Sequence, residues 1–374
     1  MYDFSKNKDK IHFIEKNDYI GGRVKSVKSN SSIFEIGSQF FCKSDTNIWE
    51  LINRKILNDD LVKLDFSNVS FFYKNKLICD IDTIVDVVNN IIEKSKKQDK
   101  VRYFDEWFIK NFDKENLFIP KGIIRAITFS DSSEILANYG TYILETFFDE
   151  CFTLKNGLEE IINSLSRNIN IENKTVQKFI FKKNRLSSMI TDKGVMKINE
   201  DIVISTAPVG DIKICGHAAL KKNLHNIKYR GCAVAIFRIK KGFPEKPDYM
   251  FFPEQQYKVS VIEQMTIGDS KFLGCLIPHN TYLEKNKTLT YCKNFIGKIL
   301  KCKFEENILE TFYQDWLKGM PVVNRNYAKA VNILDTMKFD NLIFAGDYTT
   351  LFPSMDSAVQ SGKKAQKRLE QFKF

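Results

Sequence analysis

The sequence predicts an α/β fold in which an antiparallel sheet is inserted between the two ends of the chain. At each end, a short apolar strand is followed by a glycine-bearing loop: residues 11–15 precede 21–23, and residues 341–347 precede a helix over 354–362. In the middle, residues 229–277 contain successive segments with the pattern of antiparallel strands. The 374 residues exceed one ordinary hydrophobic core, so we expect two closely joined domains.

The N-terminal pattern is a strand that ends in an acid. Ile11 to Glu15 forms the strand, and Gly21, Gly22 and Arg23 begin six residues after the acid. An acid at a strand end suits a ribose hydroxyl, and a glycine pair with an arginine suits a pyrophosphate. A lone run of this kind is equally typical of a hairpin turn.

The C-terminal pattern is a buried strand, a short loop and a helix. The strand begins at Asn341 and ends in Gly346 and Asp347, and the helix begins near Met355. The N-terminus of such a helix brings backbone N–H groups and a positive dipole end close to an electron-rich ligand. Taken together, the two ends of the chain resemble the two halves of an FAD site.

The remaining elements follow from hydrophobic periodicity between these ends. Helices are predicted at 81–93, 119–129, 134–148 and 158–165, and strands at 69–73, 76–79, 176–181, 186–191, 229–239, 249–252, 259–265 and 271–277. A turn is predicted at 192–194, where Asp, Lys and Gly separate two strands.

The ordered motifs resemble the flavin-containing amine oxidase superfamily, which includes monoamine oxidases, protoporphyrinogen oxidases and plant-type carotenoid desaturases. That family opens with a strand, a Glu, a GGR segment and an acid-hydrophobic-Gly step, and it closes with AGD, MEGA and SG. The matching segments here, in family order, are Glu15, 21–23, 35–39, 201–208, Trp316 with 319–321, 345–347, 355–358 and 361–362.

The resemblance implies a discontinuous organisation. Residues 1–60, 154–215 and 325–374 would form an FAD-binding, Rossmann-like domain. Residues 61–153 and 216–324 would form an α+β substrate domain built on the antiparallel sheet, which in the family is the floor of the substrate cavity.

The resemblance also implies a role for individual residues at the cofactor. Glu15 would accept a hydrogen bond from the adenosine ribose, Arg23 would pair with a phosphate oxygen, and Asp347 would bond the ribityl or phosphate region. The full set expected at FAD is Glu15, Gly21, Gly22, Arg23, Gly37, Ser38, Gln39, Val176, Gly346, Asp347, Met355 and Ala358. The plain alternatives are a solvated strand end for Glu15, a surface ion pair for Arg23 and a cap or turn for Asp347. We nominate no catalytic acid–base pair.

One part of the family pattern does not match. A dinucleotide fold normally begins with a strand and a G-x-G-x-x-G turn, about 20 residues before the acid, and counting back that far from Glu15 passes Met1. We interpret Tyr2 to Lys6 as the end of the first helix, so the first strand of the Rossmann-like domain is missing. We expect a start codon assigned too late rather than a lost phosphate site.

Two sequence differences from true amine oxidases argue against an amine as the substrate. Those enzymes place an aromatic residue just before the MEGA helix, where this chain has Ser354, and they carry a lysine on a strand that corresponds to 231–237, which has none. We therefore predict an FAD-dependent oxidoreductase that desaturates a large, apolar, isoprenoid-like small molecule. The alternatives are an amine or protoporphyrinogen-type oxidase of the same fold, or a redox-inactive flavin-fold partner protein.

Composition argues against other classes of function. The net charge of +11 arises from lysines spread along the chain, and no RNA-binding motif accompanies it, so we expect no nucleic-acid partner. The eight Cys and four His are scattered without metal-ligand spacing, so we expect no metal site.

The sequence also predicts the location of the protein. We see no signal peptide and no apolar run of about 18 residues, so a cytoplasmic protein is expected. Peripheral membrane contact remains open through Phe147 and Phe148 or through Phe251 and Phe252, although buried packing is the default interpretation of both pairs.

Overall fold

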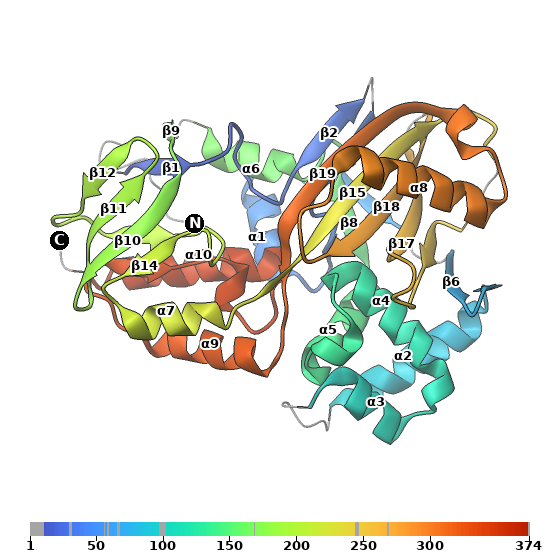
Figure 1. Cartoon of the computed structure of the whole chain (residues 1–374), viewed down its shortest axis with the longest axis horizontal. Coiled ribbons are helices and arrows are strands. Elements are labelled where there is room, and N and C mark those ends of the chain that lie inside the picture. The colour runs from blue at the N-terminus through green and yellow to red at the C-terminus, as the bar shows by residue number, and fades with distance from the viewer. Residues whose placement is uncertain are drawn as a thin grey trace.

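A computed structural model of the chain describes residues 11–29, 32–55, 57, 60–65, 68–96, 102–167, 169–243, 247–267 and 269–372. The helix end expected at residues 2–6 lies outside these ranges. The chain folds into a mixed α/β structure that extends along one axis, with a large sheet in one lobe and smaller sheets lying above helices in the other (Figure 1).

The large sheet has seven strands in the order β19-β15-β18-β17-β16-β6-β7. Its strands are β6 (Val69–Tyr73), β7 (Lys76–Ile78), β15 (Tyr229–Ile239), β16 (Tyr249–Phe251), β17 (Val261–Ile267), β18 (Ser270–His279) and β19 (Ile308–Pro321). All neighbours are antiparallel except β16 and β6. The predicted antiparallel sheet between residues 229 and 277 is therefore confirmed.

Helices cover both faces of this sheet, because alternate residues of its central strands are apolar on each side. Helix α8 (Lys285–Leu300) packs on the face that contains Ala233, Ala235 and Phe237. The opposite face, with Val234 and Ile236, joins a cluster that includes α4 (Phe118–Thr128). Around α4 lie α2 (Ile81–Ser95), α3 (Phe104–Asn111) and α5 (Ala137–Phe147) (Figure 1).

The other lobe contains two parallel strand pairs and a four-stranded sheet. The parallel pairs are β1 (Phe13–Glu15) with β9 (Ile171–Asn173), and β13 (Val203–Ser205) with β20 (Leu342–Phe344). The four-stranded sheet has the order β12-β11-β10-β14, with β10 (Val176–Lys182), β11 (Arg185–Thr191), β12 (Gly194–Lys197) and β14 (Lys213–Cys215). Helices α7 (Ala218–His225), α9 (Arg325–Thr336) and α10 (Met355–Leu369) lie beneath these strands (Figure 1).

Short elements lie where the two lobes meet. They are the antiparallel pair β2 (Ser26–Ser29) and β3 (Ser32–Glu35), the small sheet of β4 (Phe41–Cys42), β8 (Cys151–Leu154) and β5 (Leu61–Leu64), and helices α1 (Thr46–Lys55) and α6 (Glu159–Ser166). Helix α10 packs against α1 across this junction.

The predicted elements are present, and their differences from the sequence prediction are at the ends. The helix expected over 134–148 begins at Ala137, because Ser132–Glu134 forms a separate 3₁₀ turn with a capping box on Asp131. Within the family-matched segment 201–208, the strand spans Val203–Ser205 and ends before Pro208. Pro208 lacks an N–H group and does not extend the strand.

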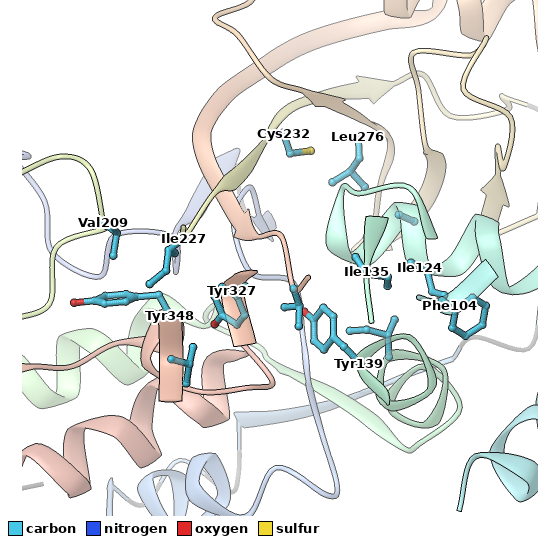
Figure 2. Close-up of a cluster of buried hydrophobic side chains, with 14 of the residues drawn as sticks. Phe104, Ile124, Ile135, Tyr139, Val209, Ile227, Cys232, Leu276, Tyr327 and Tyr348 are labelled. Carbon is cyan, nitrogen blue, oxygen red and sulfur yellow. The ribbon is translucent and has the colours of Figure 1, made fainter. Parts of the chain in front are cut away.

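One continuous apolar cluster joins the lobes. Figure 2 shows it passing from Val209 and Ile227 through Tyr348, Tyr327 and Tyr139 to Ile124 and Phe104. The three buried tyrosines each donate to a backbone carbonyl oxygen, of Ser205 at 3.2 Å, Thr350 at 2.7 Å and Pro353 at 3.3 Å respectively. Satisfying these hydroxyls removes the cost of burying them.

None of the helices in the described part of the chain is long and apolar enough to span a membrane. Of the aromatic pairs considered for membrane contact, Phe147, Phe251 and Phe252 are buried in the interior. Phe148 alone is exposed, at 37%.

Candidate cofactor site

The glycine turn after β1 leaves backbone groups accessible. Gly21 and Gly22 have φ angles of 104° and 58°, values that favour glycine. The turn is closed by a hydrogen bond from the Val24 N–H to the Gly21 carbonyl oxygen, at 3.0 Å. A Cβ added at Gly22 would meet nothing within 4 Å, so the chain is open to a ligand at this position.

An ion pair between a half-buried arginine and a buried carboxylate joins the two ends of the chain. Arg23 Nη2 lies 2.8 Å from Asp347 Oδ1, and Arg23 Nη1 donates to the Gly319 carbonyl oxygen at 2.6 Å. Burial lowers the pKa of Arg23, but the charge of Asp347 and its hydrogen bond outweigh burial and raise that pKa overall. Sequence reasoning predicted a phosphate partner for Arg23. The structure gives it two protein oxygens, because the buried Asp347 carboxylate requires a counter-charge.

The loop after β3 packs directly on this ion pair. Ser38 donates its backbone N–H to the Arg23 carbonyl oxygen at 2.8 Å. A Cβ at Gly37 would lie 2.0 Å from that same oxygen, so only glycine allows this approach. Gln39 follows, and its Nε2 donates to both carboxylate oxygens of Glu263 on β17, at 2.8 and 2.9 Å.

The C-terminal strand–loop–helix has the geometry that the sequence predicts. Gly346 has a φ of 133°, and its N–H donates to Ser361 Oγ on α10 at 2.6 Å. Helix α10 begins at Met355 with a capping box between Ser354 and Ser357. Ala358, in the first turn of this helix, is exposed.

Asp356, next to Met355, serves another helix. Its Oδ1 accepts backbone N–H groups of Asn47 at 2.7 Å and Ile48 at 3.0 Å. These donors lie in the first turn of α1, so Asp356 caps a helix more than 300 residues away in sequence.

The predicted ribose-binding acid and Val176 lie close together. Glu15 ends β1, where its Oε1 accepts from the backbone N–H and side-chain amide of Asn17, both at 2.9 Å. The Lys174 N–H donates to the Glu15 carbonyl oxygen at 3.0 Å. Because β10 begins two residues later, Val176 is brought beside the end of β1.

The structure thus brings Arg23, Gly37, Ser38 and Asp347 together around one ion pair and places Glu15 near the start of β10, and the chemistry of these residues fits FAD. Backbone N–H groups at Gly21 and Gly22 and at the first turn of α10 suit a pyrophosphate or an electron-rich ring. The half-buried Glu15 at its strand end suits a ribose hydroxyl. Asp347 is held in position by Arg23 and by the N–H of Tyr348, at 2.9 Å.

Three functional contacts were missed from the sequence. Gly319 accepts from Arg23, and Trp316 Nε1 donates to the Ile36 carbonyl oxygen at 2.8 Å, so the 316–321 segment supports the first segment of the site. The third is the contact of Glu263 with Gln39. Its signal in the sequence was a single acid at an apolar position of a strand, between Val261 and Met265.

Two buried glutamates have strongly perturbed acidity. Burial raises the pKa of Glu263 to about 7, and the hydrogen bond from Gln39 only partly offsets this. Burial also raises the pKa of Glu35 to about 7, although the Leu158 N–H and the Ser26 hydroxyl donate to its carboxylate. Within the described residues, no group of three or more His, Cys, Asp or Glu side chains is arranged to hold a metal ion.

Comparison with known proteins agrees with this geometry. The model of the flavin-containing amine oxidoreductase family matches residues 5–273. Comparison with curated protein sequences finds no significant match.

Several solved structures share the fold over nearly the whole chain. A protein assigned as a protoporphyrinogen oxidase from Exiguobacterium sp. 255-15 superposes with a TM-score of 0.74 at 13% identity, covering 97% of this chain and 93% of that one. A triple mutant of putrescine oxidase gives 0.72 at 12% identity, covering 96% and 93%. A fatty acid isomerase from P. acnes that produces CLA gives 0.72 at 15% identity, covering 96% and 92%.

The family match covers most of the chain, so this protein belongs to the flavin-containing amine oxidoreductase family. It is an FAD-dependent oxidoreductase.

Proposed function

We propose that the enzyme removes hydrogen from a large, apolar, isoprenoid-like substrate, with FAD as the hydride acceptor. The observation that carries this proposal is the character of the sheet face beside Gln39. On that face Cys232, Val234 and Ile236 of β15 and Leu276 of β18 are buried, and strand 231–237 carries no basic residue.

The chain's own residues would hold the cofactor and exclude water. Gly21 and Gly22 would donate backbone N–H groups to the pyrophosphate, and Glu15 would accept from the ribose. The N-terminus of α10 would stabilise negative charge on the reduced ring. The apolar sheet face would keep water from the reacting carbon.

We also propose which parts of the chain form the FAD-binding domain and which form the substrate domain. Residues 1–60, 154–215 and 325–374 would form the FAD-binding domain, and residues 61–153 and 216–324 would form the substrate domain. In this arrangement the parallel pairs β1–β9 and β13–β20 belong to one Rossmann-like sheet with a further strand between them. The parallel pairing within each of the two pairs supports the proposal.

A second candidate is an amine or protoporphyrinogen-type oxidase. The buried Glu263 carboxylate favours it, because an acid on an otherwise apolar face is suited to a cationic group. The names of the structural neighbours are consistent with this alternative.

Anaerobic reduction of the purified flavoprotein tests both candidates. We expect long-chain isoprenoids to bleach the flavin absorbance and small amines to leave it unchanged. Bleaching by amines or a porphyrinogen, without a response to isoprenoids, would establish the second candidate. A preparation that binds no FAD would contradict both and favour a redox-inactive flavin-fold protein.

A further inference from the structure

Gln39 and Glu263 connect the loop after β3 to the centre of the large sheet. Glu263 is 1% exposed, and both of its carboxylate oxygens accept from the single Nε2 of Gln39. The Gln39 backbone is held in place, because the preceding Ser38 is bonded to Arg23 and Gly37 packs on the same carbonyl oxygen. Movement at this contact is therefore restricted to the Gln39 side chain.

Glu263 has no positive partner in the part of the chain that the structure describes. The ionisable groups that share its surroundings are Tyr249 of β16, Cys232 of β15 and Cys275 of β18, and burial raises the pKa of all three, so they are neutral at pH 7. The nearby acids and bases of other elements are engaged elsewhere. Glu35 of β3 accepts from Ser26 and Leu158, and Arg125 of α4 donates to the carbonyl oxygens of Phe252, Glu254, Tyr257 and Val259.

The hydrogen-bonding chemistry of the pair depends on one proton. An ionised carboxylate only accepts, so it selects the NH₂ end of the Gln39 amide and turns the amide oxygen away. A protonated Glu263 carries an O–H donor beside its remaining acceptor oxygen, so it can donate to the amide oxygen once the NH₂ group is turned away. A rotation of the amide by half a turn exchanges the two arrangements without moving the backbone.

We propose that Glu263 and Gln39 form a proton-linked positioning pair, in which a proton on Glu263 reverses the Gln39 amide and converts the amide group that points away from Glu263 from an acceptor to a donor. The proton exchanges with water. Glu263 is a positioning residue because it acts through Gln39. The elevated pKa of Glu263, about 7, supports the proposal, since both forms are then populated near neutral pH. The inference rests on the proposed function, with Gln39 among the residues at FAD as the family resemblance implies.

Infrared titration of the cofactor-free protein tests whether Glu263 gains a proton near neutral pH and whether Gln39 affects its pKa. We expect the absorption of a protonated carboxylic acid to disappear around pH 7 in the native protein, and the part that belongs to Glu263 to be missing in Glu263→Gln. In Gln39→Met that titration should move to higher pH, because Glu263 loses the donor that stabilises its ionised form. A Glu263 signal that titrates near 4.5, its ordinary value, or that Gln39→Met does not shift, would overturn the pair.

The FAD-loaded protein tests the consequence at the cofactor. We expect the flavin absorbance to change with pH with the same midpoint as the infrared signal, and this change to be lost in Glu263→Gln and in Gln39→Met. Glu35→Gln is the matched control, because Glu35 has the same raised pKa but bonds Ser26 and Leu158, so its variant should keep the change.

A pH-dependent flavin spectrum that survives in Glu263→Gln or in Gln39→Met would overturn the role at the cofactor. Failure to bind FAD would instead contradict the proposed function. In that case the infrared titration still decides whether Glu263 and Gln39 are linked by a proton.

Discussion

At the scale of single residues, two buried carboxylates in this protein are stabilised in different ways. Asp347 is paired with the guanidinium of Arg23, at 2.8 Å. Glu263 is bonded to a neutral amide, so the neutral acid competes with the ionised form. The two buried acids therefore differ in the partner that the fold gives them, a cation for Asp347 and a neutral amide for Glu263.

Replacing Asp347 with Asn should destabilise the protein by about 2 to 3 kcal/mol. The change leaves the Arg23 guanidinium without its anion, and the partial exposure of Arg23, 31%, reduces the cost below that of a fully buried pair. Urea unfolding measures the loss. The control is Asp335→Asn, which removes an exposed pair with Arg368 and should cost under about 1 kcal/mol. Equal losses in the two variants would contradict the central role of the Arg23–Asp347 pair.

Replacing Glu263 with Gln should change how stability depends on pH. The folded pKa of Glu263 is raised from 4.5 to about 7, so its contribution is complete below pH 4.5 and is lost as pH rises through 7. Glu263→Gln has no carboxyl group to ionise, so it keeps its stability as pH rises. Its free energy of unfolding, relative to that of the native protein, should therefore increase between pH 4.5 and pH 7 by roughly 3 kcal/mol. Denaturant unfolding at a series of pH values measures it. A difference that stays constant from pH 5 to pH 8 would refute the raised pKa.

At the scale of elements, close approach of backbone segments holds the site together. Gly37, in the loop after β3, packs on the carbonyl oxygen of Arg23. From the end of β19, Gly319 accepts a hydrogen bond from the Arg23 side chain, and Trp316 donates one to the Ile36 carbonyl oxygen in the loop after β3. The N-terminus of α1 is capped by Asp356 from α10. Each contact joins segments far apart in sequence, so the site forms only with the whole fold.

Replacing Gly37 with Ala should disrupt this packing. The new Cβ would lie 2.0 Å from the Arg23 carbonyl oxygen, a backbone atom that moves only if the Arg23 loop moves. We expect a loss of about 2 to 3 kcal/mol and weaker FAD binding, measured by thermal unfolding and by FAD titration.

The matched control is Gly362→Ala in α10, where a Cβ meets nothing within 4 Å. Alanine is the better helix former, so this variant should gain about 0.5 to 1 kcal/mol. If Gly37→Ala were as stable as the native protein, the tight approach of the two loops would be wrong.

At the scale of the whole molecule, an ion pair brings together the two ends of the chain, where we propose the FAD site. Glu15 and Gly22 lie near the start, Asp347 and Met355 lie near the end, and the Arg23–Asp347 pair holds them together. An unfolded chain cannot assemble such a site, so FAD should bind the folded state alone.

The melting temperature should therefore rise with FAD concentration. At a free concentration one hundred times the Kd, the gain should be about 2.7 kcal/mol, and removing FAD should reverse it. Thermal scans across a concentration series measure this. FMN is the control ligand, because it lacks the adenosine half that Glu15 would hold, and it should stabilise less. A melting temperature that does not change with FAD concentration would contradict the proposed FAD site.

The sequence predicted the elements well because their signals are local. The period of the apolar residues predicted α2 and α4, and the alternation after Tyr229 predicted the antiparallel strands. The glycine and acid positions at both chain ends predicted a shared site because those residue types have special backbone freedom or charge. The prediction was less accurate at the ends of elements, because capping interactions determine where a helix begins. The capping box on Asp131, which forms a separate 3₁₀ turn before α5, is an example.

By itself, the sequence determined the mixed α/β fold class, the family resemblance and the two segments that meet at the Arg23–Asp347 ion pair. Only the tertiary structure decided the partners: Arg23 with Asp347 and Gly319, Asp356 with α1, and Gln39 with Glu263. Periodicity and motif spacing report on neighbours along the chain. Which distant side chain satisfies a buried charge depends on how the elements pack, because burial creates the need for a partner and the packing determines which group is within reach.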